Sequence, residues 1–163
     1  GQTGRLFPFL MRTLVARGDL EQARSMTLPR SWRIHQNDTY EAQAELAAAS
    51  ASWDEAPGLV RAMREHAERA GTAALVPFAD RLEGRASLAA GDPTTAASLL
   101  QRAADRFEEL SAPWERALTL VDIARALAEM GKRDEARAAL DDAVSTFTAL
   151  RSVHDLERAR DVL

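Results

Sequence analysis

Arginine is the residue type whose spacing in this chain could support binding chemistry. Arg81 and Arg85 lie four residues apart, so on a helix they would share one face, one turn apart. Arg125 follows Arg85 by 40 residues. Guanidinium groups bind carboxylates and phosphates through paired hydrogen bonds, so this set could hold an acidic peptide tail or an anionic metabolite. The alternative is that these arginines pair with nearby carboxylates, namely Glu83, Glu115, Asp122 and Glu129.

No other set of residues predicts catalysis or metal binding. His35, His66 and His154 are far apart, and none has the spacing of a metal-binding motif. Adjacent carboxylates such as Glu108 and Glu109 would point to different sides of a helix. The chain has no cysteine, which excludes a disulfide, a thiolate ligand and a cysteine nucleophile. We therefore expect no enzyme activity, no catalytic residue, no metal and no cofactor.

The composition predicts an all-α protein. Of the 163 residues 46% are hydrophobic and 28% charged, and Ala, Leu, Arg and Glu dominate. These four residue types favour helix, and no alternating pattern of a strand competes with them. Acidic and basic residues are interspersed, with a net charge of -4, so direct nucleic-acid binding is not expected.

Targeting signals are also missing from the sequence. No stretch approaches the roughly 18 apolar residues of a membrane helix, and residues 1–5 lack a signal-peptide pattern. We expect a cytoplasmic protein that does not enter a membrane. The missing initiator methionine suggests a fragment of a larger multidomain protein.

The elements that would position the arginines come from an internal repeat. When Gly91 is aligned with Gly131, a shift of 40 residues superposes apolar positions at helical spacing. The matched pairs are Ala96 and Ala136, Leu100 and Leu140, Ala103 and Ala143, Phe107 and Phe147, and Leu110 and Leu150. A degenerate copy contains Ala51, Ala56, Val60 and Met63, and a first copy contains Gly18 and Ala23.

Each copy predicts two helices joined by a tight turn, because the apolar pattern runs into Gly and then resumes. First helices are expected at 4–17, 38–51, 73–90 and 113–130, and second helices at 19–27, 54–70, 92–110 and 133–150. A terminal helix is expected at 153–163. Asp92 before Pro93 is a helix-start signal, and Asp38 with Glu41 has the spacing of a capping box.

The repeat resembles the tetratricopeptide repeat, in which small residues let paired helices approach closely. The best copy contains Leu120, Ile123, Ala124, Leu127, Gly131, Ala136, Leu140 and Ala143. The resemblance implies one domain, a right-handed superhelical solenoid of about four antiparallel helix pairs with repeats at 4–36, 37–71, 72–112 and 113–152. The sequence of residues 107–144 is similar to the repeat regions of large bacterial ATP-binding LuxR-type transcriptional regulators and nucleotide-cyclase-linked signalling ATPases.

In such a superhelix the first helices would line a concave face. The ligand or peptide site that the resemblance implies there consists of Arg12, Phe78, Arg81, Arg85, Leu118 and Arg125. The expected function is a non-enzymatic protein-interaction and regulatory scaffold that binds a protein partner or other domains of the parent chain. The alternative is a domain that senses a small-molecule inducer in the concave groove.

The terminal helix suggests a possible homodimer. Val153, Leu156, Val162 and Leu163 are apolar, and no following repeat would cover them.

Overall fold

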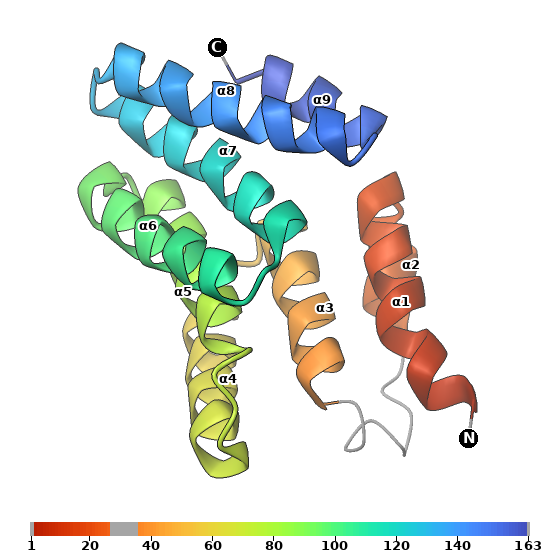
Figure 1. Ribbon diagram of the computed structural model, residues 1–163. Coiled ribbons are helices and arrows are strands. Elements are labelled where there is room, and N and C mark those ends of the chain that lie inside the picture. The colour runs from red at the N-terminus through yellow and green to blue at the C-terminus, as the bar shows by residue number, and fades with distance from the viewer. Residues whose placement is uncertain (1, 27–35, 163) are drawn as a thin grey trace. The chain divides into compact units, whose positions relative to one another are not determined.

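The chain folds into helices throughout the part that the structure describes. The computed structural model describes residues 2–26 and 36–162, except for the side chains of residues 2–5, 153 and 154. These residues contain no strand, so the all-α prediction is confirmed. The helices are α1 (Gln2–Arg17), α2 (Leu20–Ser25), α3 (Gln36–Ala49), α4 (Ala56–Ala70), α5 (Val76–Ala89), α6 (Pro93–Glu109), α7 (Pro113–Glu129), α8 (Arg133–Ala149) and α9 (Val153–Arg160) (Figure 1).

Several expected helix boundaries differ from the structure by two or three residues. Helix α2 ends early because Met26 is extended, at φ −67° and ψ 127°. Helix α5 begins at Val76 instead of residue 73, since the Thr72 hydroxyl accepts a hydrogen bond from the Ala74 amide and holds a turn there. Asp38 lies inside α3, so it does not start a capping box as predicted.

The glycine turns form as predicted. Gly18, Gly91 and Gly131 adopt φ values of 80°, 80° and 77°, the left-handed conformation that closes a helix. Ala51 stands where the repeat would place a glycine, and it adopts a φ of 51° in spite of its Cβ. Helix α6 then starts at the Asp92 carboxylate, which accepts a hydrogen bond from the Thr95 amide at 3.0 Å.

The chain divides into two compact units, Gly1–Leu82 and Glu83–Leu163, and the boundary falls within α5. In the first unit α1 packs on α2 and α3, and α3 also contacts α2 and α4. The core of this unit includes Phe7, Met11, Leu14, Ala23 and Ala42, with Leu46 packed against it. On α1 three apolar side chains remain highly exposed, and these are Leu6, Phe9 and Leu10.

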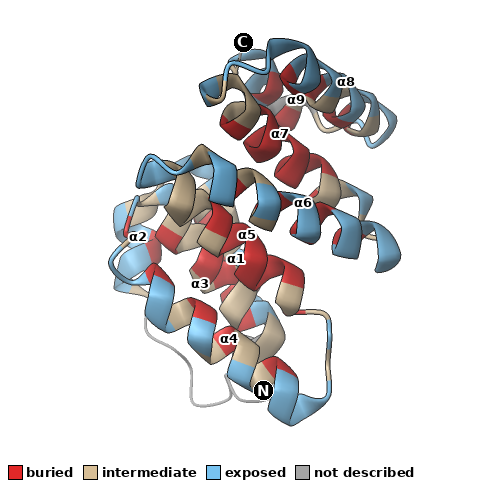
Figure 2. Cartoon of the chain, turned by 90° about the vertical axis from the view of Figure 1, so that its left-hand side faces the viewer, coloured by how far each residue is buried: buried red, intermediate tan, exposed pale blue. Residues whose placement is uncertain are grey.

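In the second unit α7 is the central helix. It packs against α6 and α8, and α9 packs against α8 (Figure 1). Figure 2 shows α7 buried along most of its length. The repeated positions Ala96 and Ala136, like Phe107 and Phe147, are buried as the alignment predicts. Leu110 and Leu150 do not belong to the core, because both lie at helix ends and are 44% and 47% exposed.

The small residue Gly84 allows α5 and α6 to approach closely, as predicted. A Cβ at this position would lie 2.8 Å from Cγ of Leu100 and 3.4 Å from the carbonyl oxygen of Ala96. Leu100 is fully buried, so its side chain has little room to move away.

The terminal helix is covered by its own unit. Ala159 is buried, and Leu156 and Val162 pack partly against the core around α7. The Val153 side chain and Leu163 lie outside the described residues. The homodimer through this helix stays a prediction. Among the described helices none is long and apolar enough to cross a membrane.

Candidate functional site

In the first unit the predicted site arginines contact carboxylates. The Arg12 guanidinium lies 3.5 Å from the Glu41 carboxylate of α3. The Arg81 guanidinium donates to the Glu45 carboxylate at 2.7 Å, and the Arg81 side chain is only 1% exposed. Its guanidinium also lies over the Phe78 ring, 5.2 Å from the ring centre, as a cation-π contact. Arg81 is therefore held by groups of its own unit.

In the second unit two arginines share one buried carboxylate. Arg85 Nε donates to Oδ2 of Asp122 at 2.6 Å, and Arg125 Nη1 donates to Oδ1 of Asp122 at 2.9 Å. The Asp122 side chain is 5% exposed and that of Arg85 is 12% exposed, whereas that of Arg125 is 40% exposed. Leu118, on the same helix, is buried. Arg125 is the most exposed member of the cluster of Arg85, Asp122 and Arg125.

These ion pairs connect the first helices of consecutive predicted repeats. Arg12 joins α1 to α3, Arg81 joins α5 to α3, and Arg85 joins α5 to α7. The sequence predicted Asp122 as an alternative partner of these arginines, and Glu45 was not among the predicted carboxylates. The site itself stays a prediction, and its residues are divided between the two units.

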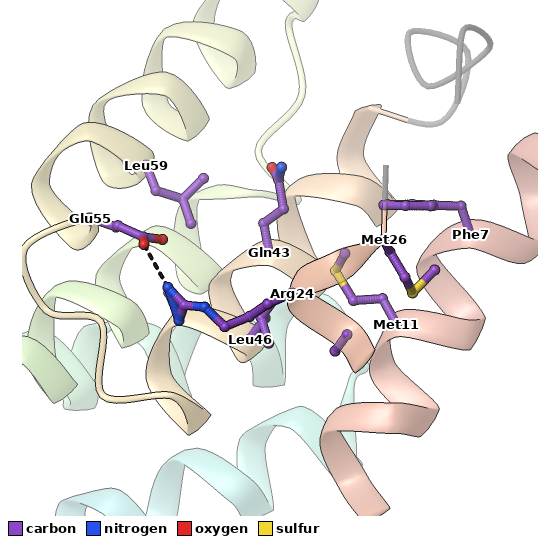
Figure 3. Close-up of a pocket in the computed structure, with 10 residues that line it drawn as sticks. Phe7, Met11, Arg24, Met26, Gln43, Leu46, Glu55 and Leu59 are labelled. Atoms are coloured by element: carbon purple, nitrogen blue, oxygen red, sulfur yellow. Dashed lines mark hydrogen bonds and ion pairs between the residues drawn. The ribbon is translucent and has the colours of Figure 1, made fainter. Parts of the chain in front are cut away.

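Sequence reasoning missed a cavity of about 440 Å³ in the first unit (Figure 3). It lies among α1, α2, α3 and the start of α4. Seven of its ten lining residues are apolar: Phe7, Met11, Ala23, Met26, Leu46, Ala47 and Leu59. No single helix predicts such a cavity, because its walls come from four segments that are distant in the sequence.

Three polar side chains complete the lining of this cavity. The Arg24 guanidinium donates to the Ser52 hydroxyl and, at 2.8 Å, to the Glu55 carboxylate (Figure 3). The Arg24 and Glu55 side chains are 44% and 57% exposed. The Gln43 side-chain amide is half-buried and makes no hydrogen bond with the described part of the chain. The cavity thus combines an apolar lining with groups that can both donate and accept hydrogen bonds.

His66, the one histidine whose side chain the structure describes, has no metal-binding geometry. His66 Nε2 lies 3.1 Å from the Asn37 side-chain oxygen, and its ring packs against Tyr40. Within residues 2–26 and 36–162, no cluster of three or more His, Cys, Asp or Glu residues could hold a metal ion. His35 and the His154 side chain lie outside the described part.

Comparison with known proteins supports the repeat. Residues 87–160, from the end of α5 to the end of α9, match the tetratricopeptide repeat family. Neither the curated proteins nor the solved structures contain a match to the chain. The matched segment contains the two copies that align most clearly at a shift of 40 residues.

Proposed function

We propose, on the premise that residues 87–160 are similar to the tetratricopeptide repeat, that this chain is a protein-binding module. Tetratricopeptide repeats form a non-catalytic scaffold and generally mediate protein-protein interaction. Paired helices with short turns give such a scaffold a rigid surface whose side chains are fixed before a partner arrives, which lowers the entropic cost of binding.

The exposed guanidinium of Arg125 supports a binding site for carboxylates in the second unit. The Arg125 side chain is 40% exposed, and it shares the Asp122 carboxylate with Arg85. Arg125 uses one of its five N–H groups for Asp122 and has no other partner in the described part of the chain. A carboxylate of a partner can therefore form a charge-assisted hydrogen bond with Arg125 while Asp122 stays paired with Arg85.

We accordingly propose that the second unit binds an acidic segment of a protein partner at Arg125. In this proposal Arg85 holds the Asp122 carboxylate in place. Leu118, a predicted site residue, lies on the same helix as Arg125. Arg12, Phe78 and Arg81 belong to the first unit, where their contacts with Glu41, Glu45 and each other give them a structural role in this proposal.

Fluorescence anisotropy with a labelled peptide of alternating glutamate and leucine tests this proposal. We expect binding to weaken by about tenfold or more in Arg125→Gln, because loss of a charged hydrogen bond is worth about 1.5–3 kcal/mol. Binding should also weaken as ionic strength rises. Arg137→Gln on α8 is the matched control, since Arg137 is exposed and has no partner in the described residues. If Arg125→Gln binds the peptide as tightly as Arg137→Gln does, the proposed site at Arg125 is refuted.

The second candidate function is sensing of a small-molecule inducer. The cavity of about 440 Å³ in the first unit favours it, because its volume and mixed lining are those of small-molecule sites. Calorimetric titration with sugars and nucleotides tests this alternative. Heat that saturates at one ligand per chain would support it, and the absence of heat across the panel would exclude those ligand classes.

We further propose that the module belongs to a larger bacterial signalling protein, as its resemblance to LuxR-type regulators and cyclase-linked ATPases implies. In such a protein it would couple a signal to an ATPase and an output domain. The complete coding sequence tests this step. A phosphate-binding loop or a DNA-binding helix pair in the same polypeptide would support it, and a complete reading frame without either would contradict it.

A further inference from the structure

The cavity of the first unit is large enough to hold a ligand. Its volume of about 440 Å³ falls within the range of about 300–1,000 Å³ that is typical of ligand pockets. Two methionines, Met11 and Met26, belong to its apolar wall, and their unbranched side chains adapt to the shape of an incoming group. The site therefore has room for one large apolar group and a wall that can close around it.

The polar groups of the cavity determine what that apolar group should carry. The Gln43 amide has both a donor and an acceptor without a partner in the described part of the chain. A main-chain peptide group also has one donor and one acceptor, so the two amides can satisfy each other. An apolar molecule without an amide would leave the half-buried Gln43 unsatisfied, which disfavours it.

Arg24 adds a preference for a carboxylate. Two of its five N–H groups donate to Ser52 and Glu55, and the others have no partner among the described residues. The exposed contact with Glu55 is weak, so the guanidinium can turn toward a second carboxylate at little cost. Figure 3 shows Arg24 reaching toward Glu55 while Gln43, Leu46 and Leu59 project from the neighbouring helices.

We infer that this cavity binds one large apolar residue of a peptide, with its main-chain amide at Gln43 and an adjacent carboxylate at Arg24. The inference rests on the proposed function as a protein-binding module and adds a second, apolar anchor in the first unit. It does not involve Arg125 or any other residue of the second unit.

Amide NMR of the complete chain with N-acetyltryptophan as the probe tests this inference. The probe joins one large apolar side chain to an amide and a carboxylate. We expect saturable shifts around Gln43 and Leu59, and none with N-acetylglycine, which lacks the apolar group. Gln43→Leu should weaken binding about tenfold. Gln101→Leu, a matched change at an exposed position on α6, should leave the affinity unchanged.

A second variant tests the cavity independently in case Gln43→Leu does not fold. Leu59→Trp should fill the cavity from a half-buried position and abolish the shifts while the helical circular dichroism stays unchanged. Three results would overturn the inference: shifts that map away from the cavity, equal affinity in Gln43→Leu, or equally tight binding of indole propionate, which lacks the amide. The last result would make a small apolar acid the ligand. If these tests fail while Arg125→Gln still weakens the acidic peptide, only the cavity inference falls.

Discussion

Asp122 is the residue whose removal best separates a structural from a binding role of the arginines. Its carboxylate is 5% exposed and accepts hydrogen bonds from Arg85 and Arg125 at 2.6 and 2.9 Å. Asp122→Ala removes the carboxylate that both guanidinium groups contact. The Arg125 side chain is 40% exposed and can be hydrated instead, so loss of its contact with Asp122 should cost less than about 1 kcal/mol.

Arg85 accounts for most of the expected effect. Its side chain is 12% exposed, and removal of one partner of a buried ion pair costs about 3–5 kcal/mol. Arg85 also has a further interaction, which reduces this cost. We therefore expect Asp122→Ala to destabilise the second unit by about 2–4 kcal/mol. Native-state hydrogen exchange of the α7 amides measures this change, because these buried amides exchange only when the structure around them opens.

Asp142→Ala is the matched control. Asp142 accepts from Arg116 at 2.9 Å, and the hydrogen bond raises the pKa of the Arg116 guanidinium. The two side chains are 46% and 24% exposed, so the loss should stay below about 1 kcal/mol. In the Arg85→Ala background, Asp122→Ala should cost about 1–3 kcal/mol less than it does alone. Equal effects of Asp122→Ala and Asp142→Ala would refute the buried ion pair as a stabilising element.

Three other predictions concern the helices and their turns. Gly84→Ala should lower the free energy of unfolding in urea by about 1 kcal/mol, because the clash with Leu100 outweighs the gain in helix propensity. Gly58→Ala, where the added Cβ would meet open space, should raise it by about 0.5–1 kcal/mol. Ala51→Gly should raise the free energy of unfolding by about 1 kcal/mol, since it removes the cost of a Cβ at a φ of 51°; a lower thermal midpoint would contradict this. Hydrogen bonds from Thr95 lower the pKa of Asp92 below its usual 3.8. The Asp92 carboxylate therefore stabilises α6 fully above pH 3.8, and this stabilisation is lost as the pH falls through the folded pKa. Hydrogen exchange of the Thr95 amide measures the loss, and Asp92→Asn should lack this pH dependence.

Much of the fold could be predicted from the sequence because its signals are local. The shift of 40 residues between Gly91 and Gly131 identified the turns, and both glycines adopt the left-handed conformation. The apolar spacing around Ala96 and Phe107 identified the buried face of α6. The same spacing failed at Leu110 and Leu150, because helix ends leave one side of a residue open to solvent whatever its hydrophobicity.

Local sequence patterns specify the helices, their turns and the buried faces, since periodicity and glycine act within one or two turns of the chain. Packing between helices sets which arginine is accessible. Arg81 is buried against Glu45 and Phe78, while Arg125 shares Asp122 and remains 40% exposed. The tertiary structure also formed the cavity beside Gln43, because its walls come from four helices whose separation depends on side chains that are distant in sequence. Exposure and cavity shape are set by packing between segments, and no local pattern in the chain encodes them.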